Sequence, residues 1–248
     1  MKNLKLTFLL TCIAATTPVH AALVAAPGGV AYYDTVLDIT WQANANLSAG
    51  NTFDVTGVNA AGGMSWSAAQ NWLTAMNDAS YLGVDTWRLP ENNPVNGSSY
   101  DVTQSFDGST DQGYNLGGAG SVLPGTTVSE MAYMYYTELG NLPYQEGPPV
   151  AITACGLAGT CLANTGPVAN LLPELYWGAS PWPDDANQRW AFSFETGEQR
   201  TQNVNAEFLV WAVADGNVFN VQTVPVPAAV WLFASALIGL AGLRRRLV

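Results

Sequence analysis

The chain has 248 residues, of which 19 are acidic and eight basic, so its formal net charge is −11 at neutral pH. An acidic surface repels nucleic acid, heparin-like glycans and anionic lipid headgroups, because binding to a polyanion depends on Lys and Arg side chains that displace its counterions. The charge therefore excludes these partners.

The first 21 residues have the pattern of a secretory signal peptide. Lys2 and Lys5 precede an apolar run over residues 6–15, and Val19 and Ala21 stand three and one residues before the predicted cut. Cleavage before Ala22 removes both lysines, the only histidine and one cysteine. We expect the protein to be exported through the inner membrane.

Residues 22–223 form the body of the chain, which is long enough for one sizeable core and is predicted to be one domain. Three arginines and no lysine stand against 19 acidic residues here, which gives a net charge of −16. This charge either keeps an exported protein soluble or binds divalent cations. Solubility is favoured, since net charge bears on association and not on fold.

The body begins with a predicted β-hairpin and continues with a predicted helix. Residues 30–41 are of β type on both sides of an Asp34-Thr35 turn. Ser65 suits a helix N-cap, because apolar residues follow it at helical spacing. These residues are Trp66, Ala69, Leu73 and Met76. We interpret this stripe as part of the core.

A second helix is predicted at residues 128–139. Thr127 and Glu130 have the spacing of a capping box. Gly140 suits the left-handed stop of a helix. Between these signals one apolar face recurs every four residues, at Met131, Tyr135 and Leu139.

Three β segments are predicted after residue 170, at residues 175–177, 190–194 and 208–213. Trp190, Phe192 and Phe194 alternate with smaller residues, so this strand has one aromatic face. Thr196-Gly197 supplies the turn that follows it. Together with the two helices, these segments predict an α+β domain with antiparallel strands and long ordered loops.

Two cysteines remain in the body, Cys155 and Cys161. In an oxidising compartment we expect them to form a disulfide that closes a small loop. A metal site needs more thiolates or histidines than the body has, and a catalytic cysteine would lack a histidine partner.

Residues 84–90, VDTWRLP, are similar to the DWRLP signature of the DUF1566 family, also called the Lcl C-terminal domain family; the matching residues are Asp85, Trp87, Arg88 and Pro90. Further stretches follow that family's order, at residues 107–115, 129–132, 138–141, 176–178, 190–192 and 211–213. The resemblance implies an exported bacterial protein with a C-type-lectin-like fold, in which two helices lie beside antiparallel sheet. Glycan or surface binding follows from it by analogy alone.

Arg88 has a structural and a binding interpretation. In an extended segment, Trp87 and Leu89 would be buried on one face and Arg88 would point to the other, while Pro90 ends the strand. A guanidinium so placed is satisfied by a bidentate carboxylate or by loop carbonyls. We favour this structural role over that of an anion ligand.

Asp107, Ser109 and Asp111 stand at alternate positions, as in the opening of a calcium-binding loop. The pattern then breaks, since glycine comes one position late and Gly118 occupies the place of the final glutamate. Asx turns explain the same residues without a metal. Ca²⁺ is therefore the second interpretation, after the turn.

The loop at residues 180–187, SPWPDDAN, is the candidate ligand site. Two prolines hold Trp182 in an extended loop, and Asp184, Asp185 and Asn187 offer hydrogen bonds to hydroxyl groups. A sugar ring stacked on Trp182 is one interpretation. A tryptophan folded over the core is the other, and it is favoured.

No enzymatic activity is expected. Loss of His20 excludes Ser-His and Cys-His catalysis, and no lysine is left for a Schiff base. The leading hypothesis is a noncatalytic surface or matrix-associated protein that binds a polysaccharide or a surface protein through its loops. The alternatives are a structural biofilm or exopolysaccharide component without a specific ligand and a carboxylate-dependent glycan hydrolase.

Residues 224–248 combine a proline-rich approach, an apolar span and a terminal arginine cluster. The span, residues 228–243, is about 24 Å long as a helix, which is short for a hydrocarbon core of about 30 Å. The layout resembles the PEP-CTERM sorting signal handled by exosortase, at Val224, Pro225, Pro227, Arg244, Arg245 and Arg246. The resemblance implies a transient inner-membrane helix, removal of the tail by an exosortase-type enzyme and a final location at the cell surface or in the extracellular matrix.

Overall fold

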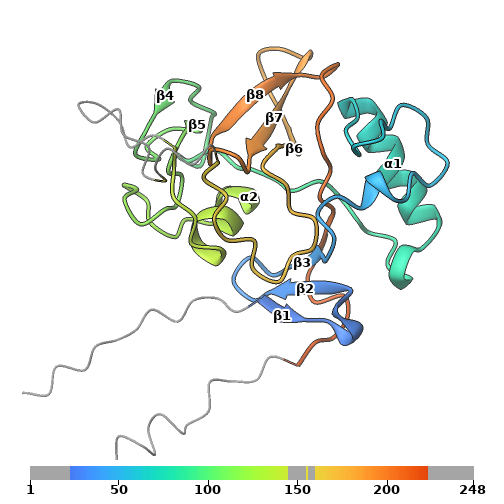
Figure 1. Cartoon of the computed structure of the whole chain (residues 1–248). Coiled ribbons are helices and arrows are strands. Elements are labelled where there is room, and N and C mark those ends of the chain that lie inside the picture. The colour runs from blue at the N-terminus through green and yellow to red at the C-terminus, as the bar shows by residue number, and fades with distance from the viewer. Residues whose placement is uncertain (1–22, 145–154, 156–159, 223–248) are drawn as a thin grey trace, which may run out of the picture.

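The computed structural model describes residues 23–144, 155 and 160–222 and contains two β-sheets, one at its centre and one at its lower edge in Figure 1. The predicted signal peptide and sorting signal lie outside these residues. The described part is an α+β fold with two α-helices, as the sequence predicts. Within it, no helix is both long and apolar enough to cross a membrane.

The first sheet joins the beginning of the body to its end. Its strands are antiparallel and lie in the order β1-β2-β3-β9. Their bounds are β1 Leu23–Ala25, β2 Ala31–Asp34, β3 Ile39–Gln42 and β9 Val213–Asp215. The predicted hairpin is confirmed as β2 and β3. Its turn is held by Asp34, whose Oδ1 accepts from the backbone N–H groups of Val36 and Leu37.

The second sheet has the order β4-β5-β8-β7-β6, antiparallel except between β4 and β5. The bounds are β4 Gln104–Ser105, β5 Gln112–Gly113, β6 Leu175–Pro181, β7 Gln188–Ser193 and β8 Gln199–Asn203. The predicted strand at 208–213 is wrong over most of its length, because residues 208 and 209 make only isolated bridges and regular pairing starts at Val213. Residues 208 and 209 instead form backbone hydrogen bonds with Met64 and with Leu175 and Trp177 of β6.

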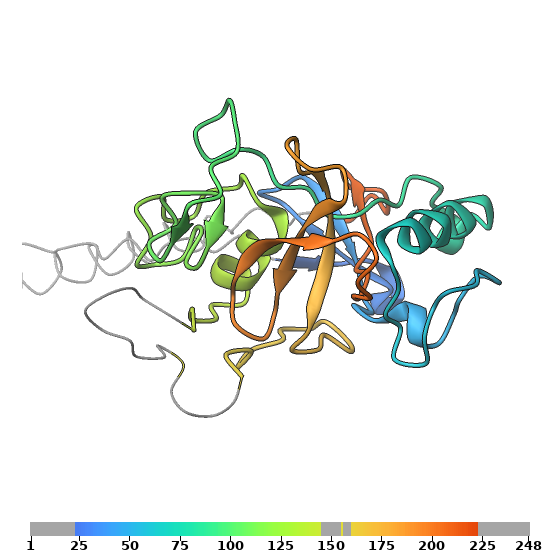
Figure 2. The same ribbon diagram turned by 90° about the horizontal axis from the view of Figure 1, so that it is seen from above.

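Helix α1 (Trp66–Asp78) begins where the sequence predicts, since the Ser65 hydroxyl accepts from the N–H of Ala68 at 3.3 Å. Ala69, Leu73 and Met76 are buried in the core, and Trp66 is half-buried. Figures 1 and 2 place the strands β6, β7 and β8 between α1 and α2. Each helix therefore packs on its own side of this sheet.

The second helix differs from the prediction in its start and in its form. Ser129, and not Thr127, is the N-cap, with its hydroxyl accepting from the N–H of Ala132. Helix α2 covers only Glu130–Tyr133 and continues as the π-helix η4, Met134–Glu138. The wider π turn lets Met134, Tyr135 and Tyr136 all face the core. Gly140 has the left-handed conformation expected of the stop, with φ 64°.

The remaining helical turns are short 3₁₀ segments in the loops: η1 Pro27–Gly29, η2 Leu47–Ala49 and η3 Tyr81–Gly83. The core has two parts, one on each side of the second sheet. Tyr176, Phe192 and Phe194 pack with α2 and η4, whereas Trp177 and Ala191 pack with α1. The strand at 190–194 thus has the predicted aromatic face, and its opposite face is buried as well.

Candidate functional site

The DTWRLP segment ties three parts of the fold together through Arg88. Its backbone pairs with Val213, and the two N···O distances are 2.7 and 2.9 Å. The guanidinium holds Glu130 in a bidentate contact at 2.8 and 2.9 Å and donates to Asp215 at 2.6 and 2.9 Å. Burial lowers the pKa of Arg88, but the two carboxylates more than offset this effect and the pKa is raised. Arg88 is therefore engaged inside the fold.

The neighbours of Arg88 fit this structural role. The side chains of Trp87 and Leu89 are buried, and Pro90 accepts from the N–H of Ala179 through its carbonyl oxygen. Asp85 lies exposed on the surface. The capping box predicted for Glu130 is absent because its carboxylate accepts from Arg88 and from the N–H of Glu91.

Asp107, Ser109 and Asp111 take part in a turn and in hydrogen bonds to the backbone. Asp107 closes an Asx turn on the N–H of Ser109, and both residues are exposed. Asp111 is buried, and its two oxygens accept from the N–H groups of Val95 and Asp101, each at 2.7 Å. In the described ranges no three acidic, histidine or cysteine side chains gather as a metal-binding group. This geometry favours the turn over Ca²⁺.

The structure bonds the sulfur atoms of Cys155 and Cys161, whose Cα atoms lie 5.1 Å apart. Cys161 is buried in the core beside α2 and η4, and its N–H donates to the carbonyl of Glu195. The hydrogen bond from Cys161 to Glu195 ties this cysteine to the turn after β7.

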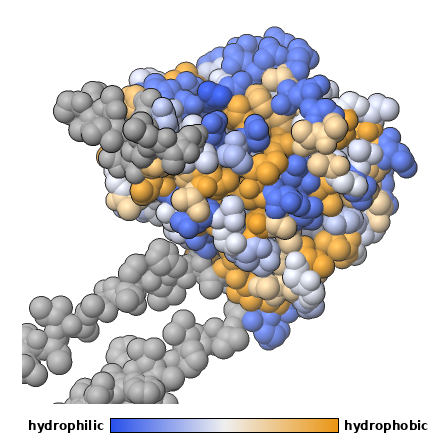
Figure 3. Space-filling view, in the orientation of Figure 1, coloured by the Kyte–Doolittle hydropathy of each residue, from blue (hydrophilic) through white to orange (hydrophobic). Residues whose placement is uncertain are grey.

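The face of the molecule in Figure 3 intersperses polar and apolar residues. A ligand site therefore depends on local hollows and on the side chains that line them. Two such pockets carry side chains suited to recognition.

The first pocket, which we call the aromatic pocket, has a volume of about 320 Å³ and brings the Trp182 loop against the loop before β4. Its lining residues are Pro94, Ser98, Ser99, Tyr100, Trp182, Pro183 and Asp184. Trp182 is half-buried and stands edge-on to the buried ring of Trp190, with ring centroids 5.7 Å apart. Tyr100 packs on the same ring at 5.3 Å. Trp182 thus both covers the core and lines a pocket.

The wall of the aromatic pocket is held by hydrogen bonds to the backbone of Asn92. The hydroxyls of Tyr100 and Ser180 both donate to the carbonyl of Asn92 at 2.7 Å. Burial raises the pKa of Tyr100, so its hydroxyl stays protonated as a donor at neutral pH. Two buried donors beside these residues, Asn92 Nδ2 and Trp190 Nε1, have no partner in the described part of the chain.

The predicted ligand residues divide into two pairs. Trp182 and Asp184 line the aromatic pocket. Asp185 instead accepts from Asn187 and Gln188, and these hydrogen bonds lower its pKa and close the turn before β7. Tyr100 was missed by sequence reasoning, because it lies 82 positions from Trp182 and belongs to no motif.

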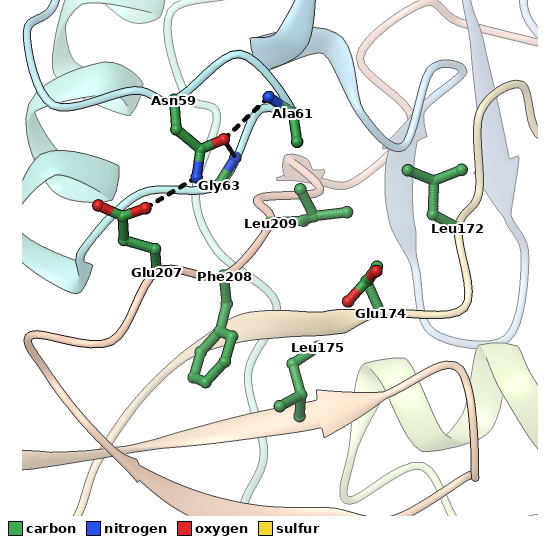
Figure 4. Close-up of a pocket in the computed structure, with 9 residues that line it drawn as sticks. All are labelled: Asn59, Ala61, Gly63, Leu172, Glu174, Leu175, Glu207, Phe208 and Leu209. Atoms are coloured by element: carbon green, nitrogen blue, oxygen red, sulfur yellow. Dashed lines mark hydrogen bonds between the residues drawn. The ribbon is translucent and has the colours of Figure 1, made fainter.

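The second pocket, shown in Figure 4, lies where residues 59–63 meet residues 172–175 and 207–209. Its volume is about 220 Å³. Asn59 accepts from the N–H groups of Ala61 and Gly63 and donates to Glu207 at 2.8 Å. Figure 4 shows Glu174 away from Glu207, with apolar side chains between them. No sequence pattern pointed to this pair of carboxylates.

Comparison with protein-family models, with curated protein sequences and with solved structures gave no match. The likeness to the DUF1566 family and to the PEP-CTERM signal therefore stands on the residues given above. The sorting residues, from Val224 to Arg246, lie outside the described residues. The function is accordingly inferred from the geometry of the pockets and from the charge of the chain.

Proposed function

We propose that the protein is an exported, noncatalytic surface or matrix-associated domain that binds glycans through the aromatic pocket. The observation that carries this proposal is the meeting of Tyr100 and Trp182 with the hydroxyls of Ser98 and Ser99 and the carboxylate of Asp184. Aromatic rings offer a flat apolar surface to a sugar ring, and a few convergent polar groups fix its orientation.

The charge of the chain narrows the class of glycan. With a net charge of −16 on the body and Asp184 in the pocket, sulfated and uronic-acid polymers are repelled. Neutral or amino-bearing sugars are the expected ligands. Ca²⁺ is not required, because the pocket's own hydroxyl and carboxylate groups suffice for hydrogen bonding.

The location belongs to the same proposal. The signal peptide, the PEP-CTERM-like tail and the order of DUF1566-like stretches support export, sorting by an exosortase-type enzyme and a C-type-lectin-like fold. Two helices beside a largely antiparallel sheet, with long loops, agree with that fold class at the coarse level. The partner would be a polysaccharide or glycosylated surface protein met outside the cell.

A glycan array with the exported chain, with and without Ca²⁺, tests the proposal. Trp182→Ala should abolish binding, whereas Trp182→Phe, which keeps an aromatic face, should retain part of it. Glu174→Gln, in the other pocket, is the matched control and should bind as the native chain does. Absence of binding to any glycan under either condition would leave the structural matrix component as the better hypothesis.

A carboxylate-dependent glycan hydrolase is the second candidate, favoured by the presence of Glu174 and Glu207 in one pocket (Figure 4). Paired carboxylates cleave glycosidic bonds as acid and base or as acid and nucleophile. Release of reducing sugar from a polysaccharide, lost in both Glu174→Gln and Glu207→Gln, would establish this activity.

A further inference from the structure

The aromatic pocket combines two partly open aromatic rings with an exposed carboxylate. The rings of Tyr100 and Trp182 have centroids 6.4 Å apart and meet at 52°. Each ring is only partly buried, so part of it borders the hollow. Asp184 lines the same hollow and is exposed, and within the described residues no ion pair engages its carboxylate. A negatively charged acceptor thus stands beside two π systems.

The surroundings of Tyr100 add negative potential to the pocket. Burial raises the pKa of Tyr100, and the charges of Asp111 and Glu91 raise it further, while the Ser180 hydroxyl opposes them. A nearby negative charge acts on a phenol in this direction because it disfavours the phenolate. The same charges attract a cation that enters the pocket.

Two of the three arginines in the described part of the chain are paired with carboxylates outside the pocket. Arg88 holds Glu130 and Asp215. Arg200 is paired with Glu198 at 3.2 Å. Both positive charges are therefore offset by carboxylates that do not line the pocket.

Arg189 is the arginine closest in sequence to the pocket, and it lies on the other face of β7. Adjacent side chains of a strand point to opposite faces. Trp190 has its side chain on the pocket face, where Tyr100 and Trp182 pack on its ring. The guanidinium of Arg189 instead lies over the ring of Trp66 at 4.5 Å and donates to two backbone carbonyls. The wall of the aromatic pocket thus has no basic side chain among the described residues.

We propose that the aromatic pocket selects sugars that carry a free primary amine, with the ammonium group bound to Asp184 and against the faces of Trp182 and Tyr100. This inference rests on the glycan binding proposed above and narrows its ligand class. An ammonium group is attracted to the face of an indole or a phenol, and it has three N–H donors. The carboxylate of Asp184 and the hydroxyls of Ser98 and Ser99 are the acceptors that the pocket offers.

The charge of the amine distinguishes this class from other sugars of the same shape. An acetylated amine keeps one N–H donor but has no charge, so it loses the Coulomb attraction to Asp184 and the cation–π attraction to the rings. A hydroxyl at the same position also has one donor and no charge. The free amine is therefore preferred over both.

Three oligosaccharides with the same β-1,4 backbone test the proposal: the pentamers of glucose, of glucosamine and of N-acetylglucosamine. Isothermal titration calorimetry with the exported chain, at about pH 6 and low salt, measures their dissociation constants. We expect the glucosamine pentamer to bind about tenfold more tightly than the other two, the effect of one cation–π contact together with one exposed ion pair. Raising the ionic strength to about 1 M, where the Debye length is about 3 Å, should remove most of this preference.

Two substitutions of exposed aspartates separate the pocket from the charge of the whole chain. Asp184→Asn keeps the shape of the side chain and removes its charge, so the glucose and glucosamine pentamers should then bind with similar dissociation constants. Asp85→Asn is the matched control, because Asp85 is exposed and does not line the pocket; it should keep the preference. Thermal unfolding should give the same Tm for both variants and the native chain.

Equal binding of the three pentamers by the native chain, or a preference that persists in Asp184→Asn, would overturn the inference, and glycan binding by the aromatic pocket would stand. A lysine pentapeptide that binds as tightly as the glucosamine pentamer would also overturn it, because the pocket would then recognise the charge without the sugar ring. If none of the pentamers binds, the amine preference is wrong, and the proposed function fails with it only if the glycan array is blank as well.

Discussion

Two pairs of carboxylates lie at the two ends of one helical segment, and they are balanced differently. Glu130 opens α2 and shares Arg88 with Asp215 of β9. Glu138 closes η4 and shares a buried site with Asp34 of β2, where the described residues offer no cation. Of these two pairs, only the one that contains Glu130 is paired with an arginine in the described part of the chain. The pair without an arginine is balanced by a proton instead, because burial raises the pKa of Glu138 to about 8.

Removing Arg88 should have the largest effect on this comparison. Arg88→Ala leaves the largely buried Glu130 without its cation and frees two segments, so we expect a loss of about 3 kcal/mol in the free energy of unfolding. Arg88→Lys keeps the charge without the planar fork and should lose about half as much. Urea denaturation measures both. A loss below about 0.5 kcal/mol for Arg88→Ala would show that the cluster does not stabilise the fold.

Asp111 is a buried carboxylate that is held by backbone N–H groups, without an arginine. Both oxygens accept N–H groups at 2.7 Å. Asp111→Ala leaves these donors unsatisfied, and we expect it to lower the free energy of unfolding by about 2 kcal/mol. Asp111→Asn, which keeps one acceptor, is the control and should cost less. If added Ca²⁺ stabilised the native chain and not Asp111→Asn, the turn interpretation of this loop would be wrong.

The pH dependence of the free energy of unfolding tests the pair formed by Glu138 and Asp34. The pKa of Glu138 is raised from its ordinary 4.5 to about 8, so the folded state binds the proton more tightly than the unfolded state. Its contribution is fully present below about pH 4.5 and is lost as the pH rises to about 8. Because Glu138 is partly exposed, we expect a decline of about 2 kcal/mol.

Thermal unfolding from pH 5 to pH 9 measures this decline, and Glu138→Gln should flatten the profile, because the amide does not titrate. An equal decline in Glu138→Gln would show that another group is responsible for it.

The smallest effect is expected at Asp215. Its side chain is 79% exposed although it lies 2.6 Å from Arg88, and solvent screens such a contact. Asp215→Asn should change the free energy of unfolding by less than about 0.5 kcal/mol, in contrast to Arg88→Ala. A loss as large as that of Arg88→Ala would mean that Asp215, and not Glu130, is the principal partner of the arginine.

Sequence patterns predicted correctly those elements that are stabilised by contacts between residues close together in the chain. Ser65 caps α1 because a hydroxyl beside the first turn accepts an N–H wherever the helix lies. The hairpin of β2 and β3 likewise follows from residues adjacent in the chain. The start of the second helix was missed because Arg88, 42 positions away, binds Glu130 and removes it from the capping box.

The candidate sites divide in the same way. Trp182 and Asp184 were found because prolines and polar neighbours mark a loop. Tyr100 and the two pocket serines come from another loop that only the fold brings alongside. Glu138 gave no sequence signal, since a glutamate at a helix end is ordinary until burial and a facing carboxylate change its chemistry.

By itself, the sequence determined the α+β class, the cap of α1, the hairpin, the shortage of cations and the absence of lysine from the predicted mature body. These properties depend on composition or on neighbours within about one turn of chain. The tertiary structure alone decided which carboxylate receives Arg88, which loop meets Trp182 and which strand start stands beside Asp34 and Glu138. Those outcomes depend on contacts between distant segments, where burial makes each unpaired charge costly and so selects its partner.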